Sequence, residues 1–188
     1  TAWQMYQADE LDLAYPLPND IQGEFVNSDN EEFHNGPDLA LYYYNLNNDV
    51  KPFNNPKVRK ALSMGIDRQT LVEHVVQGGQ KPALSIIPPG IPDVSGDFQE
   101  NTGELFKEDA DEAKKLLEEG LQEEGLDEMP EFTILYNTLE AHKKIAEAIQ
   151  EMWRKNLGVE VELENAEFQV KIDREQAGDY DISRAGWI

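Results

Sequence analysis

The chain has 188 residues, of which 39% are hydrophobic and 29% charged, a composition that favours one folded domain with a substantial core. Its 38 acidic and 16 basic side chains give a formal net charge of -22, which disfavours binding to nucleic acids and to anionic membrane surfaces because like charges repel. The absence of cysteine excludes disulfides, thiolate metal sites and cysteine nucleophiles. No apolar run approaches the roughly 18 residues of a membrane span. No signal peptide opens the chain, so both ends are expected to be arbitrary boundaries.

Two strands are predicted in the first 50 residues. Residues 10–18 (ELDLAYPLP) alternate apolar and polar side chains before two prolines, which predicts a short strand that runs into an extended turn. Residues 38–48 contain three consecutive tyrosines and predict a second strand. Since side chains alternate along a strand, Tyr42 and Tyr44 are expected on one face and Tyr43 on the other.

Two helices are predicted next, followed by a long segment without periodicity. Pro56 is placed at the start of the first helix, Gly65 interrupts the pattern, and Asp67 is the predicted N-cap of the second helix. Residues 77–103 are rich in glycine and proline, yet apolar side chains recur in them and need somewhere to pack. This segment is therefore predicted to cross the surface as ordered, extended chain.

The C-terminal half has a regular order of elements. A helix is predicted over residues 107–121, followed by a strand over 131–137, a helix over 141–157 and a strand over 159–166. A strand, helix and strand with short connections imply a right-handed crossover and parallel pairing. Residues 179–187 predict one more strand. The whole pattern favours an α/β domain in which helices pack on both faces of a sheet.

No catalytic or metal-binding constellation stands out from the residues. The three histidines have no helical zinc spacing, the serines lack a nucleophile-elbow context, and the glycine-rich stretches lack the helix that a phosphate loop needs. One acidic stretch could bind a divalent cation weakly, although a polar loop without a ligand is favoured because the EF-hand spacing is absent; it contains Glu31, Glu32, His34 and Asp38. No metal site and no cofactor are predicted.

Aromatic and charged residues gather toward the C-terminus instead. They are Phe168, Glu175, Arg184 and Trp187, together with His142 at the start of the long predicted helix. Aromatic walls with a few charges suit a pocket for a polar, partly apolar ligand. The alternative is that they are core aromatics and solvated charges.

The order of motifs resembles a known family. The stretches YYYNLNNDVKPFNNPKVRKALSMGIDRQTLV, AHKKIAEAIQEMWRKNLGVEVEL and FQVKIDREQAGDYDISRAGW are similar to the oligopeptide- and dipeptide-binding proteins of bacterial ABC importers. The resemblance covers essentially the whole chain. It implies a lobe of the type II periplasmic-binding-protein kind, with a mixed β-sheet flanked by helices.

This resemblance also implies an organisation and a function. Residues 1–188 are expected to form a single domain, the continuous peptide-binding lobe of a larger two-lobed protein whose first lobe is absent at both ends. Such a protein binds oligopeptides between its lobes and delivers them to membrane permease subunits of the importer. It is extracytoplasmic, and the parent is expected to be lipid-anchored.

Site residues are carried over from the family only where the motifs match. Trp187 and Ile188 resemble positions that approach the bound peptide, and Arg184 resembles an arginine that lines or braces the cleft. Phe168 matches a position that walls a side-chain pocket, and His142 matches one near the far end of longer peptides. These residues are expected to bind the ligand.

Glu175 is included among the ligand-binding candidates as a departure from the family. Relatives can carry arginine at this position to bind a peptide carboxylate, which a glutamate cannot do. Either the carboxylate is received elsewhere, or basic or differently sized peptides are preferred. The alternatives to peptide binding are a nickel, sugar or opine ligand in the same family, a metal-dependent hydrolase, and an interaction domain without a ligand cleft.

Overall fold

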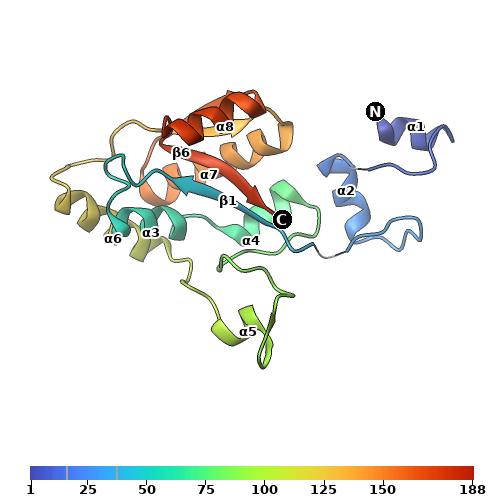
Figure 1. Ribbon diagram of the computed structural model, residues 1–188, viewed down its shortest axis with the longest axis horizontal. Helices are drawn as coiled ribbons and strands as arrows, with labels where there is room; N and C mark the ends of the chain where they lie inside the picture. Colours follow the sequence, from blue (N-terminus) through green and yellow to red (C-terminus); the bar gives the residue numbers. More distant parts are fainter. Residues whose placement is uncertain (16, 37) are drawn as a thin grey trace.

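The computed structural model describes residues 1–15, 17–36 and 38–188. A four-stranded sheet forms the centre of the main body, and two helices at the N-terminus lie to one side of it (Figure 1). The strands follow the order β1 (Leu41–Leu46), β6 (Ile182–Trp187), β4 (Thr133–Asn137) and β5 (Glu162–Ala166). Strands β6, β4 and β5 are parallel, whereas β1 is antiparallel to β6.

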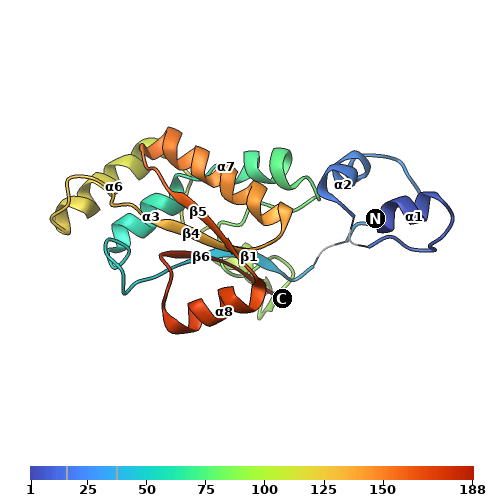
Figure 2. The ribbon, with the colours of Figure 1, turned by 90° about the horizontal axis from the view of Figure 1, so that it is seen from above.

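Helices cover both faces of this sheet, as predicted. The two faces are visible in Figure 2, where α3 (Pro56–Met64) and α7 (Glu140–Leu157) lie on one side and α8 (Phe168–Ala177) lies on the other. The predicted parallel pair is confirmed, since α7 connects β4 to its parallel neighbour β5. Helix α8 was not predicted from the sequence.

One buried layer joins the sheet to α3, α7 and α6 (Ala110–Glu123). The rings of Phe53, Phe132 and Trp153 pack in series, and the indole Nε1 of Trp153 donates a 2.8 Å hydrogen bond to the carbonyl oxygen of Leu62 on α3. A long aromatic side chain on α7 therefore fixes the position of α3 beneath the sheet.

The motif that carries the family resemblance has a structural role in this layer. The Asn55 side chain accepts a hydrogen bond from the amide of Lys57 at the start of α3 and donates one to Glu123 on α6, both at 2.9 Å. Asp67 caps α4 (Arg68–Leu71), as predicted. The chain continues as a π-helical turn, η1 (Val72–Val76). The motif thus holds helices together by capping their ends.

The segment predicted as an extended crossing contains short elements of its own. They are the hairpin strands β2 (Pro92–Asp93) and β3 (Gly96–Asp97) and the helix α5 (Phe98–Thr102). The chain just after this segment is held to the body by Arg68, whose guanidinium contacts Glu108 at 3.0 Å and lies 5.0 Å from the ring centre of Phe106.

The first 36 residues form an arm with its own small aromatic cluster. The arm holds α1 (Ala2–Gln7) and α2 (Asn19–Val26), and Trp3 packs on Phe25 at 5.5 Å between ring centres. The strand predicted over residues 10–18 is wrong, because its described residues form neither helix nor strand. Leu13 and Tyr15 are 75% and 84% exposed, so the alternating pattern has no described surface to pack against.

Candidate functional site

The carboxyl ends of the three parallel strands lie at one edge of the sheet, which we call the carboxyl edge. It is formed where β4 ends at Asn137, β5 at Ala166 and β6 at Trp187. Helices α7 and α8 begin at this same edge, directly after β4 and β5. In open α/β sheets, ligands bind outside the carboxyl ends of the strands. This edge is therefore the candidate site.

An arginine cluster, made of Tyr42, Asn137, His142 and Arg184, lies beside the carboxyl edge. The Arg184 guanidinium is 4.6 Å from the centre of the Tyr42 ring, a cation–π contact, and its Nη1 donates a 3.3 Å hydrogen bond to Asn137. The Tyr42 hydroxyl and the Nδ1 of His142 are hydrogen-bonded at 3.3 Å. Among the described residues, the buried Nε of Arg184 has no hydrogen-bond partner. This donor is enclosed by the cluster and is left unsatisfied there.

The environment of the arginine cluster keeps His142 uncharged. Burial, followed by the positive charges of Arg184 and Lys171, lowers the pKa of His142 to about 4. Burial likewise raises the pKa of Tyr42 above its ordinary value, although Arg184 acts in the opposite direction. At neutral pH both side chains are uncharged, and Arg184 is the cation of the cluster.

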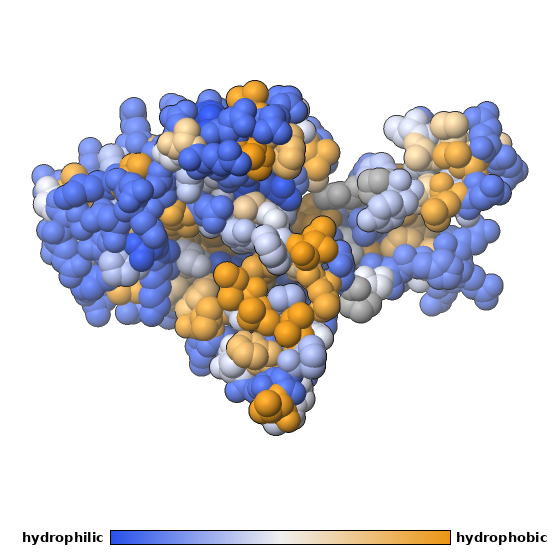
Figure 3. Space-filling model, in the orientation of Figure 1, coloured by the Kyte–Doolittle hydropathy of each residue, from blue (hydrophilic) through white to orange (hydrophobic). Residues whose placement is uncertain are grey.

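Large apolar side chains are exposed at the same edge. Trp187, Ile188 and Phe168 are 73%, 90% and 55% exposed, an unusual state for side chains of this size when they cluster. In Figure 3 the apolar atoms, drawn in orange, gather where β6 ends and continue over the segment that leads to α5. Exposed apolar side chains of this part of the chain include Ile86, which precedes α5, and Leu105, which follows it.

Five of the six candidate residues thus lie along β6 or at the carboxyl edge, and Glu175 is apart from them. Because α8 starts at Phe168 and runs away from the carboxyl edge, Glu175 lies about 10 Å further along the helix. Its carboxylate contacts the Nζ of Lys171 at 2.7 Å, and Lys171 is only 3% exposed. The charge of Glu175 is therefore used to pair a buried lysine.

Sequence reasoning missed three residues of this region. Tyr42 was noted only within a tyrosine run, and neither Asn137 nor Lys171 was selected. A polar residue at the very end of a buried strand is a usable signal for Asn137. The buried state of Lys171 has no such signal, because lysine is ordinarily an exposed residue.

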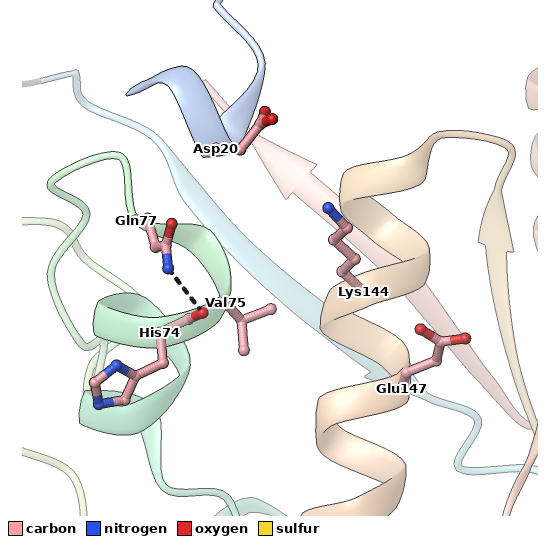
Figure 4. Close-up of a pocket in the computed structure, with 6 residues that line it drawn as sticks. All are labelled: Asp20, His74, Val75, Gln77, Lys144 and Glu147. Carbon is pink, nitrogen blue, oxygen red and sulfur yellow. Dashed lines mark hydrogen bonds between the residues drawn. The ribbon is translucent and has the colours of Figure 1, made fainter. Parts of the chain in front are cut away.

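A separate pocket of about 380 Å³ lies between α2, η1 and α7 (Figure 4). It is lined by Asp20, His74, Val75, Gln77, Lys144 and Glu147, and the Gln77 side chain donates a hydrogen bond to the carbonyl oxygen of His74. The pocket is open and its charges are of both signs. Within residues 1–15, 17–36 and 38–188, no three acidic or histidine side chains are arranged to hold a metal ion, which includes the stretch around His34.

A sheet with helices on both faces and with aromatic and cationic groups at its carboxyl edge defines the class of this chain, an α/β domain. Residues 1–188 match the model of the middle region of the bacterial extracellular solute-binding proteins, family 5, and the chain belongs to that family. The family resemblance and the type II binding-protein fold are thereby confirmed, and the chain is extracytoplasmic. None of the described helices is long and apolar enough to cross a membrane.

The relatives include peptide-binding proteins. The chain is 41% identical to the oligopeptide-binding protein OppA of Bacillus subtilis, over 100% of this chain and 35% of the relative. It is 36% identical to the dipeptide-binding protein DppE of the same organism, over 100% and 34%. The solved structure of Listeria monocytogenes OppA bound to peptide superposes with a TM-score of 0.88 at 29% identity, covering 99% of this chain and 37% of that one. The chain thus spans about a third of these proteins' length.

Proposed function

We propose that residues 1–188 form one lobe of a two-lobed receptor that binds oligopeptides and delivers them to the permease subunits of an ABC importer. The observation that carries this proposal is the arginine cluster beside exposed Trp187 and Ile188 at the carboxyl edge. Its relatives are named for oligopeptide and dipeptide binding. The proposed activity is binding rather than catalysis, and the parent protein is proposed to be lipid-anchored.

Main-chain pairing explains how one site can accept many peptides. The pairing of β6 with β4 ends at Ser183. Along β6, the main-chain groups of alternate residues point to β1, and those of the residues between them point to the β4 side. The main-chain groups of Gly186 point to the β4 side and have no ladder partner among the described residues. An extended peptide can pair there through its own main chain, which leaves its side chains unselected.

The side chains at the edge supply the remaining contacts. Arg184 is only partly buried, and its guanidinium offers a charge-assisted hydrogen bond to a peptide carboxylate. Phe168 and Trp187 offer apolar walls to peptide side chains. Glu175 is neutralised by Lys171. Of the two hypotheses raised by this glutamate, we therefore favour the one in which the carboxylate is received elsewhere, at Arg184.

Isothermal titration of mixed peptides of two to five residues tests this function. The chain alone and the full-length protein that contains it are titrated side by side. We expect binding in the micromolar range or tighter by the full-length protein and weak or undetectable heat from the chain, which holds only half of the contacts. Micromolar binding by the chain alone would contradict the two-lobed account. Peptides that fail to bind the full-length protein would point instead to nickel, a sugar or an opine.

A matched pair of variants assigns the binding to the arginine cluster. In the full-length protein, Arg184→Gln is expected to weaken peptide binding by roughly 10- to 100-fold, the usual effect of losing a hydrogen bond to a charged group. Arg174→Gln is the control, because Arg174 lies on α8 in ion pairs with Glu164 and Asp179. Equal losses in both variants would show that charge alone, rather than the cluster, governs binding.

A further inference from the structure

Asn35 is the one asparagine of the sequence that a glycine follows, and both residues lie exposed outside any helix or strand. In an Asn-Gly pair, the backbone nitrogen of the glycine can attack the side-chain amide carbon of the asparagine, because the glycine has no side chain to hinder the approach. Among the described residues, a Cβ built on Gly36 would meet no atom within 4 Å beyond its chain neighbours, and the Gly36 amide donates no main-chain hydrogen bond. The attacking nitrogen is therefore accessible.

Asn27, a second exposed asparagine of the arm, shows the opposite arrangement. It lies at the end of α2 and is followed by Ser28, another small residue. The Ser28 amide donates a 2.9 Å hydrogen bond to the carbonyl oxygen of Phe25, so the equivalent nitrogen is held in a turn. The side chain of Ser28 also hinders the attack. The two asparagines thus differ in both conditions that favour cyclisation.

The side-chain amide of Asn35 joins the arm to the main body. Its Nδ2 donates a 3.3 Å hydrogen bond to the carbonyl oxygen of Gly78, and the Nε2 of Gln22 donates a 3.4 Å bond to the same oxygen. Within the described part of the chain, no other hydrogen bond joins the arm to the main body. Gly79 leaves room for this amide, because a Cβ there would lie 2.6 Å from Nδ2.

We propose that Asn35 is a site of spontaneous deamidation, and that conversion of its amide to a carboxylate releases the arm from Gly78. The Gly36 nitrogen forms a bond to Cγ of Asn35, the bond between Cγ and Nδ2 breaks, and the proton of the Gly36 amide leaves with Nδ2 as ammonia. Water then opens the resulting succinimide at one of its two carbonyl carbons. The products are aspartate and isoaspartate, in which the main chain continues through Cγ.

Neither product can keep the contact with Gly78. A carboxylate has no proton to donate, and its negative oxygens would face the carbonyl oxygen of Gly78, so the attraction becomes a repulsion. In isoaspartate the main chain is also one atom longer, which displaces the side chain. The bond from Gln22 is then the described hydrogen bond that remains between the arm and the main body. We therefore expect the modified arm to move more freely.

Peptide mapping by mass spectrometry tests the reaction on the chain aged at mildly alkaline pH. Deamidation is expected at Asn35 before any other asparagine, Asn27 included, and enzymatic methylation is expected to detect isoaspartate there. Gly36→Ala is the matched variant, because it adds a methyl group in open space and is expected to slow the reaction roughly tenfold. Equal rates at Asn35 in the two proteins, or a faster reaction at Asn27, would overturn the proposal.

The effect on the arm is measured in Asn35→Asp, which reproduces the aspartate product. In the isotope-labelled chain, the heteronuclear NOE values of the Trp3 and Phe25 amides are expected to fall relative to those of the main body, as they do when nanosecond motion increases. Asn35→Ala is the control, because it loses the hydrogen bond without adding a charge, and a smaller fall is expected. Unchanged values in Asn35→Asp would show that the carboxylate does not release the arm. Both tests are independent of peptide binding, so their failure leaves the proposed function intact.

Discussion

At the scale of single residues, the neighbours of each ionisable side chain decide whether its charge remains available at the site. His142 is kept neutral by burial and by two neighbouring cations, while Glu175 is paired with Lys171. The residue type alone did not indicate either state. The sequence placed both residues among the ligand-binding candidates, but only the packing determines which charge remains available, and that charge is on Arg184.

The depressed pKa of His142 predicts a pH dependence of stability. An unfolded histidine binds a proton near pH 6.5, whereas folded His142 does so near pH 4, so between these values the unfolded state binds more protons. The contribution of His142 to the free energy of unfolding is therefore fully present above about pH 6.5, and this contribution is lost as pH falls toward 4. Discounted for partial solvent access, the loss is about 1–2 kcal/mol.

Urea unfolding at pH 7 and pH 4.5 measures this contribution in the chain and in His142→Gln. Carboxylates also lose stabilising charge in this range, but they do so equally in both proteins. We expect the variant to lose less stability than the parent chain on acidification. The same loss in both would mean that His142 does not titrate as described.

At the scale of elements, the crossing of α3 and α6 depends on a glycine. A Cβ at Gly120 would lie 2.8 Å from Cγ2 and 3.1 Å from the backbone nitrogen of Val58, closer than atoms pack. Gly120→Ala gains about 1 kcal/mol of helix propensity but is expected to destabilise the chain by about 1–3 kcal/mol because of overpacking. Urea unfolding measures the change.

Two further variants make this prediction specific. Glu118→Ala, on the exposed face of the same helix, is expected to change stability by no more than about 0.5 kcal/mol. In a double-mutant cycle, Gly120→Ala is expected to cost less stability in a Val58→Ala background than in the parent chain, since the Val58 side chain that clashes is then absent. A Gly120→Ala variant as stable as the parent would contradict the close crossing.

Most elements of the main body could be predicted because the spacing of their apolar residues and the residues that start or end them indicate the same element. The long helix α7 ends before Gly158, which adopts the left-handed conformation with φ of 69°. The parallel pairing of β4 and β5, the strands before and after this helix, was predicted from their short connections to it. Helix α8 was missed because Phe168, Val170 and Ile172 alternate like a strand. The residues of the predicted strand at 10–18 alternate too, but alternation cannot show whether a partner is present.

At the scale of the whole molecule, the carboxyl edge of the sheet and the outer edge of β1 expose different groups. The carboxyl edge combines a cation with exposed apolar side chains, and the β1 edge offers unpaired main chain. The sequence predicted the parallel strands whose ends form part of the carboxyl edge, β4 and β5, but not a site at that edge. The arginine cluster did not, because it joins residues of β1, β4, α7 and β6 that are far apart in the sequence.

The most direct test of the central claim is an NMR titration of the isotope-labelled chain with trialanine up to millimolar concentration, where weak binding by one lobe is detectable. The account predicts that amide shifts change at Gly186, Trp187, Ile188 and Phe168 and stay constant around the pocket of Asp20. No change at the carboxyl edge, or changes confined to that pocket, would contradict it.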